Sequence, residues 1–178
     1  MNWECFSEKR SMAEEIINRV ANSKLVTIDL EDLYPKGQRL VFDIKDWLLE
    51  GLVLREKEFR ASAKAHDWSQ YEGAYVALTC STDAIIPGWA YMLLSTYLAP
   101  VAKKVVVGDP EMLETVIYTE VLLEFDVSDY QDLPVIIKGC SKKPVPKNAY
   151  LQLINKLQTV AKSIMYGEAC SSVPLFKK

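Results

Sequence analysis

Cysteine is the residue type in this sequence that offers the most distinctive chemistry. Three of the four cysteines, Cys80, Cys140 and Cys170, are each followed directly by a serine. Thiolates are soft ligands that suit zinc and iron-sulfur clusters, and both kinds of centre commonly take four protein ligands. Asp83 is the best-placed fourth donor, because it lies in the loop that follows Cys80. The sequence therefore predicts a zinc or iron-sulfur site formed by Cys80, Cys140, Cys170 and Asp83.

Two alternatives to a metal site stay open on the same residues. Cys140, or Cys80 just before a predicted helix, could act as a nucleophile or a persulfide carrier if nearby positive charge lowered the pKa of its thiol. Three basic residues surround Cys140, namely Lys138, Lys142 and Lys143. In the other alternative the cysteines are only structural and the chain is an interaction protein, because free cysteine is often simply buried. Whether the chain is an enzyme is left open.

Composition and missing motifs exclude several classes of protein. A net charge of -3 argues against a nucleic-acid partner, which normally requires a basic surplus. No apolar run is long enough for a membrane helix, and the first ten residues lack a secretory signal, so a cytoplasmic location with reduced thiols is expected. There is no phosphate-binding glycine motif and no metal-binding histidine pair. His66, the only histidine, lies in charged surroundings typical of an exposed helix end.

The elements that position the cysteines follow from the spacing of apolar residues. Residues 1–11 show no apolar period and are interpreted as a loose N-terminal arm, before a single α/β domain over residues 12–178. Apolar runs predict strands, and spacings of three and four predict helices between them. Strands are expected at 24–30, 39–44, 74–79, 104–107, 135–137 and 173–176, and helices at 56–65, 87–98, from 110, and from 146 with Gly167 as its C-cap.

This alternation predicts a three-layer sandwich, in which one mostly parallel sheet is covered by helices on both faces. Ligands bind beyond the carboxyl ends of the strands in such sheets. Cys80 and Cys140 each follow a predicted strand, so both are expected at the same rim. Cys170 follows a predicted helix, and it reaches that rim only if the last strand runs antiparallel.

Several strings together resemble an uncharacterised bacterial family, domain of unknown function 2480. They are EEIINRVANS at 14–23, FDIKDWL at 42–48, HDWSQY at 66–71, the segment 80–92, KGC at 138–140, KKPVP at 142–146 and GEACS at 167–171. The resemblance covers residues 12–178. Genes of similar proteins tend to lie beside genes for iron-sulfur cluster assembly, so the resemblance implies an accessory role in iron-sulfur metabolism, with iron-sulfur assembly proteins as partners. It assigns no role to any residue.

Overall fold

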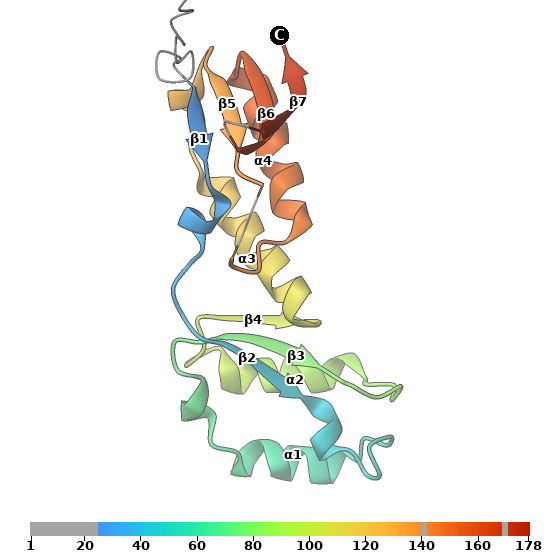
Figure 1. Cartoon of the computed structure of the whole chain (residues 1–178). Helices are drawn as coiled ribbons and strands as arrows, with labels where there is room; N and C mark the ends of the chain where they lie inside the picture. Colours follow the sequence, from blue (N-terminus) through green and yellow to red (C-terminus); the bar gives the residue numbers. More distant parts are fainter. Residues whose placement is uncertain (1–24, 140–141, 169–170) are drawn as a thin grey trace, which may run out of the picture.

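The strands of the chain form two separate sheets in a computed structural model that describes residues 25–139, 142–168 and 171–178 (Figure 1). Sheet A has the strand order β1-β5-β6-β7, and sheet B has the order β2-β3-β4. Only the pairing of β6 with β7 is antiparallel among these strands. The bounds are Val26–Ile28 (β1), Arg39–Asp43 (β2), Tyr75–Thr79 (β3), Lys104–Val107 (β4), Pro134–Ile137 (β5), Ser163–Glu168 (β6) and Ser171–Lys177 (β7).

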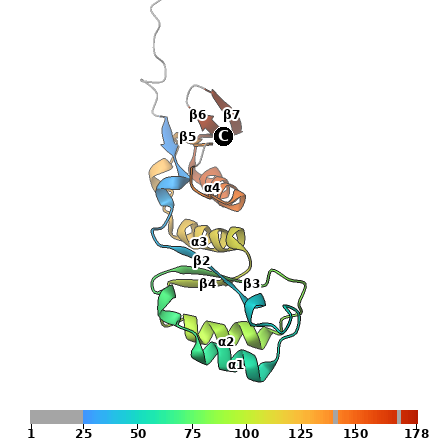
Figure 2. The same cartoon turned by 60° about the horizontal axis from the view of Figure 1, so that its bottom comes forward.

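Four α-helices in the described residues stack with the two sheets in layers. They are Glu56–Ala65 (α1), Gly88–Leu98 (α2), Pro110–Glu124 (α3) and Lys147–Val160 (α4). Figure 2 shows α1 and α2 on one side of sheet B and α3 on the other, and α4 packs against both α3 and sheet A. Within the described residues, the chain first contributes β1 to sheet A, then forms sheet B, and returns through α3 to complete sheet A.

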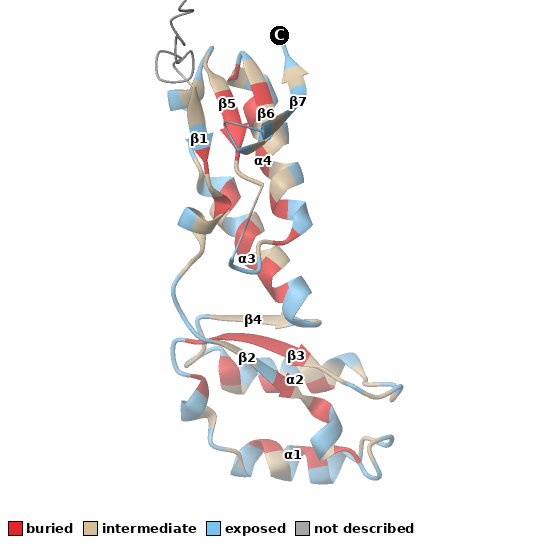
Figure 3. Ribbon diagram, viewed as in Figure 1, coloured by how far each residue is buried: buried red, intermediate tan, exposed pale blue. Residues whose placement is uncertain are grey.

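Strand β3 is buried on both faces because helices cover both sides of sheet B. Val76 and Leu78 point into the cluster formed with α1 and α2, whereas Tyr75 and Ala77 pack against α3. Alternate side chains of a strand face opposite sides of the sheet. The continuous apolar run of this strand therefore reflects two contacts, one on each face (Figure 3).

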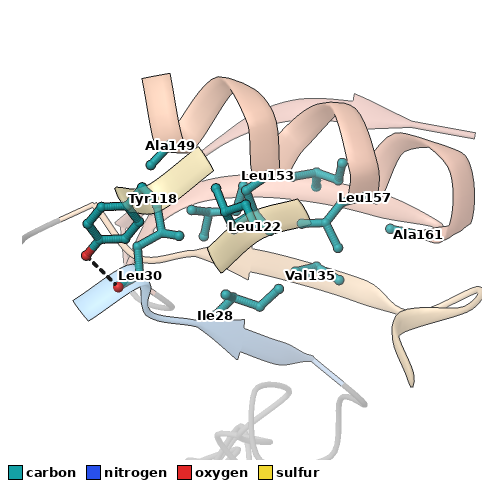
Figure 4. Packing of buried hydrophobic residues seen from close by; sticks show 11 residues of the cluster. Ile28, Leu30, Tyr118, Leu122, Val135, Ala149, Leu153, Leu157 and Ala161 are labelled. Carbon is teal, nitrogen blue, oxygen red and sulfur yellow. Dashed lines mark hydrogen bonds between the residues drawn. The ribbon is translucent and has the colours of Figure 1, made fainter. Parts of the chain in front are cut away.

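Helix α3 contributes to the cores of both sheets. Leu113 and Ile117 pack against sheet B, and Tyr118 and Leu122 pack against sheet A. Residues four apart share a helix face, so these two pairs form adjacent stripes. The Tyr118 hydroxyl donates a buried 3.0 Å hydrogen bond to the carbonyl oxygen of Leu30, between β1 and β2 (Figure 4).

The predicted mixture of helices and mostly parallel strands is confirmed, but the prediction of a single sheet is wrong. Sheet B is an insertion between β1 and α3, a long-range arrangement that the spacing of apolar residues does not encode. None of the described helices is long and apolar enough to span a membrane. The predicted N-terminal arm lies outside the described residues.

The helix predicted to run from residue 146 toward Gly167 ends earlier. Helix α4 ends at Val160, and the following residues form β6, in which Ile164 pairs with Val135 of β5. The spacing of Leu157, Ala161 and Ile164 suits a helix, but all three reach the same core from two different elements. Gly167 has a φ of 122°, and it lies at the antiparallel β6-β7 connection, not at a helix end.

We expect the two halves of the core to unfold together because α3 belongs to both. Leu122→Ala removes a buried side chain on the sheet A side and should cost about 2–5 kcal/mol. The described tryptophans, Trp47, Trp68 and Trp89, all pack in the sheet B cluster. In a Trp3→Phe background, tryptophan fluorescence should report the lower unfolding midpoint of Leu122→Ala.

Leu123→Ala is the matched control, because Leu123 is 74% exposed and its truncation should change the midpoint little. A fluorescence midpoint that Leu122→Ala leaves unchanged, while circular dichroism shows a separate earlier transition, would contradict the shared core.

Candidate functional site

Cys80 directly follows β3, the central strand of sheet B. Its side chain is partly buried against the apolar cluster between sheet B, α1 and α2. The sulfur lies 3.3 Å from the hydroxyl of Thr82, which donates a 2.7 Å hydrogen bond to the carbonyl oxygen of Gly51. The pKa of Tyr91 is raised mainly by burial and, to a smaller extent, by the nearby Cys80. Cys80 is therefore held in an apolar and hydroxyl-rich setting.

The carboxylates near Cys80 do not form a ligand set with it. Asp83 is exposed and lines a shallow hollow with Leu52 and Ile85. Asp43 accepts hydrogen bonds from the backbone amides of Lys45 at 3.0 Å and Ser81 at 3.1 Å. Although burial opposes ionisation, these bonds hold the pKa of Asp43 below its ordinary value. Within the described residues, no three histidine, cysteine or acidic side chains are grouped so as to hold a metal ion.

Cys140 and Cys170 lie outside the described residues, but the residues beside them are described. Gly139 follows β5, and Glu168 ends β6, its parallel neighbour. The Tyr166 hydroxyl donates a 3.0 Å hydrogen bond to the carbonyl oxygen of Gly139. A β-carbon on Gly139 would lie 3.3 Å from the Cα of Gly167, so only glycine fits this close approach without a shift. The segments leading into the two cysteines thus lie side by side at one edge of sheet A.

This arrangement changes which cysteines are expected to lie near one another. The prediction that Cys80 and Cys140 follow strands of the same sheet is wrong, because β3 belongs to sheet B and β5 to sheet A. Cys170 was expected to follow a helix, and it follows strand β6. The four-residue ligand set of Cys80, Asp83, Cys140 and Cys170 remains a prediction.

The lysines around Cys140 contact groups from the β1 side of sheet A. Lys138 forms a 2.5 Å salt bridge with Asp29, and the Lys143 ammonium donates a 2.9 Å hydrogen bond to the carbonyl oxygen of Glu31. Burial opposes ionisation of Asp29, but Lys138 and the Glu31 amide lower its pKa overall. The same contact raises the pKa of Lys138. The positive charge of Lys138, next to residue 139, is thus paired with a carboxylate.

His66 lies at the C-terminal end of α1, as the sequence suggested, but it is partly buried because it belongs to an aromatic cluster. Its ring lies against Phe42, Trp47, Trp68 and Tyr71, with centroid distances from 4.7 to 5.9 Å. Its Nε2 atom lies 3.1 Å from the side-chain nitrogen of Gln70. Tertiary packing of rings from several elements, which charged sequence neighbours do not reveal, produces this setting.

A second candidate site, which sequence reasoning missed, lies between the two sheets around Glu114. This α3 side chain is only 6% exposed, and its Oε1 atom accepts from Arg39 Nε at 2.9 Å and from the Tyr34 hydroxyl at 3.0 Å. The pKa of Tyr34 is raised mainly by burial and then by Glu114. This hydroxyl therefore stays protonated and donates its hydrogen bond to the carboxylate. The available signal was one glutamate within the apolar face of a predicted helix.

Arg39 connects this carboxylate to sheet B and to the connection between β1 and β2. Its Nη1 atom donates 2.7 Å hydrogen bonds to the carbonyl oxygens of Pro35 and Gly37. Its guanidinium carbon lies 4.0 Å from the Tyr34 ring centroid and 4.6 Å from that of Tyr75. The network lines a cavity of about 440 Å³. This geometry can hold a small molecule against a fixed carboxylate.

Breaking the Arg39–Glu114 pair should strongly destabilise the protein. Arg39→Met leaves Glu114 buried without its cation, which we expect to cost about 3–5 kcal/mol in chemical denaturation. Adding Glu114→Leu should recover at least about half of that loss, because the unpaired charge is gone. Lys104→Met, which breaks the exposed pair with Glu120, is the control and should cost about 1 kcal/mol or less. Equal losses for the two pairs would contradict this account.

The Asp29–Lys138 salt bridge should make the folded chain less stable at acidic pH. The pKa of Asp29 is lower in the folded chain, so its contribution is present above the unfolded-state pKa of about 3.9 and is lost as pH falls through the lower folded value. Asp29→Asn should therefore destabilise at pH 7, and its difference from wild type should shrink below about pH 4. Urea denaturation from pH 7 to pH 2.5 measures this, with exposed Asp83→Asn as the charge control. A difference that stays constant with pH would refute the assignment.

Comparison with known proteins identifies a family by sequence alone. No curated protein matches the chain. No solved structure matches it either. A family model described as "Protein of unknown function (DUF2480)" matches residues 14–178. That match includes every described residue and the segments around Cys80, Cys140 and Cys170, and the chain belongs to this family.

Proposed function

We propose that this chain binds a soft metal ion or an iron-sulfur cluster through the thiolates of Cys140 and Cys170, as an accessory protein of iron-sulfur metabolism. The observation that supports the proposal is the pairing of β5 with β6. These parallel neighbours end at the same edge of sheet A, and each leads within a few residues to one of the two cysteines. The carboxyl edge of a parallel sheet is where α/β proteins usually bind ligands.

Two chain segments approach each other closely beside the proposed site. Gly139 and Gly167 bring two chain segments nearer than side chains would permit. Zinc and iron-sulfur centres commonly take four protein ligands, so two cysteines of one chain leave positions for further donors. A second copy or an iron-sulfur assembly protein would supply them in a shared centre. Cys80 and Asp83, which belong to the sheet B side, would join only through such an assembly or a movement of the sheets.

A metal site fits these surroundings better than a thiol activated for sulfur transfer. A reactive thiol needs uncompensated positive charge to lower its pKa. Lys138 is paired with Asp29, and Glu168 and Glu31 contribute to raising the pKa of Lys138, so carboxylates gather around this edge. A metal ion displaces the thiol protons, which are released to solvent, so metal binding does not depend on a lysine-lowered pKa.

Anaerobic purification followed by metal analysis and absorption spectroscopy tests the proposal. We expect stoichiometric zinc or iron in the wild type, and a loss of at least about tenfold in metal content for Cys140→Ser and Cys170→Ser. Iron with sulfide and visible absorption identifies a cluster, whereas zinc alone is colourless. Cys80→Ser is the matched control and should keep its metal, because Cys80 belongs to the other sheet.

Two outcomes would argue against this site. Wild-type protein that is metal-free and colourless under anaerobic conditions would remove the function altogether. Metal loss in Cys80→Ser equal to that in Cys140→Ser would show that the centre includes both sheets, as the sequence first suggested. Unfolding midpoints of all three variants check that lost metal does not reflect lost structure.

A further inference from the structure

The cavity beside Glu114 lies along α3, the helix that packs against both sheets. Its walls come from three regions of the chain, namely the connection from β1 to β2, the start of α3, and the residues that lead into α4. Interfaces between substructures are frequent positions for small-molecule sites. None of the described residues that line this cavity is a cysteine, and the cavity plays no part in the proposed metal site.

The size and walls of the cavity suit a small organic molecule. Its volume is about 440 Å³, whereas a cavity of roughly 150 Å³ is enough to hold benzene. The apolar part of the wall is made of rigid or compact groups, namely Pro110, Pro144, Val145 and Pro146. Proline rings present flat hydrocarbon surfaces that lose little conformational entropy when a ligand packs against them. Flat apolar groups therefore fit these walls.

The polar end of the cavity has an acceptor that the protein uses only weakly. Glu114 Oε1 is occupied by Arg39 and Tyr34, but Oε2 is approached, among the described residues, only by Arg39 Nη2 at 3.5 Å. A hydrogen bond at that distance is marginal, and a carboxylate oxygen accepts two good bonds. Glu114 lines the cavity, so a molecule bound there can supply a further hydrogen-bond donor in place of water.

We propose that this cavity binds a small, largely apolar molecule that donates one N–H or O–H hydrogen bond to Glu114. Aromatic heterocycles that carry a ring N–H are the chemical class that best combines a flat apolar body with one donor. Arg39, which also lines the cavity, holds the carboxylate in place, and its own Nε and Nη1 donors are already used. Its fixed position makes Glu114 an orienting group for the ligand.

The arrangement does not favour an anionic ligand. Glu111 and Glu114 both line the cavity and would repel a negative charge, whereas the charge of Arg39, which lines it too, is already paired with Glu114. The first turn of α3 is already capped, because Asp109 accepts a 2.8 Å hydrogen bond from the Met112 amide. Lys147 is exposed at the mouth, where solvent and salt weaken its attraction for an anion.

Titration of the full chain with indole and N-methylindole, followed by amide chemical shifts, tests the donor directly. Indole should bind saturably at one site and shift the amides of Tyr34, Glu111 and Lys147. N-methylindole has almost the same apolar surface without the N–H, and we expect it to bind at least about tenfold more weakly, because a hydrogen bond to a charged, buried acceptor is lost. The cavity is large enough that the added methyl group does not exclude it.

Val145→Trp should fill the cavity and abolish indole binding. Leu52→Trp is the control, because it makes the same kind of enlargement in the hollow beside Asp83 and should leave indole binding unchanged. Chemical shifts of the wild type locate the site even if Val145→Trp does not fold. The proposal is overturned if indole fails to bind at millimolar concentration, if N-methylindole binds equally well, or if benzoate binds more tightly than indole. Binding that a folded Val145→Trp variant retains overturns it as well.

Discussion

Helix α3 is the element on which the arrangement of this protein depends, because it is packed from both sides. Its two apolar stripes, one around Leu113 and one around Leu122, each complete the core of a different sheet. A helix normally buries one face and leaves the other to solvent. Covering both faces of α3 joins sheets that share no hydrogen bonds in the described strands. The position of each sheet therefore follows from side-chain packing.

The buried carboxylate of Glu114 is a consequence of that double packing. Between the two apolar stripes, α3 presents a position that faces the connection from β1 to β2, where Tyr34 and Arg39 satisfy it. A buried charge is tolerated only with a partner and hydrogen bonds. The pair fixes the relation of the β1-β2 connection to α3, and the adjoining prolines leave the cavity that the closed core does not fill.

The cysteines are divided by the same topology. Insertion of sheet B between β1 and α3 removes β3, and with it Cys80, from the sheet that contains β5. Strand β6 then takes the place next to β5 and brings the segment before Cys170 to the edge that Gly139 occupies. The proposed thiol site thus lies at sheet A, and the proposed small-molecule site lies between the two sheets.

Local signals in the sequence determined most of the elements. The alternation of strands and helices, the start of α3 with Asp109 as its N-cap, and the exposed helix at Glu56–Ala65 follow from propensity, capping and spacing. The α/β class follows as well, and so does the edge strand at the end of the chain. Only the tertiary structure decided which strands pair, because pairing depends on contacts far apart in sequence. It turned Ser163–Glu168 from an apparent helix end into a central strand, since Ile164 reaches the same core in either conformation. It also brought Arg39 and Tyr34 to Glu114, 75 and 80 residues away, which no local pattern predicts.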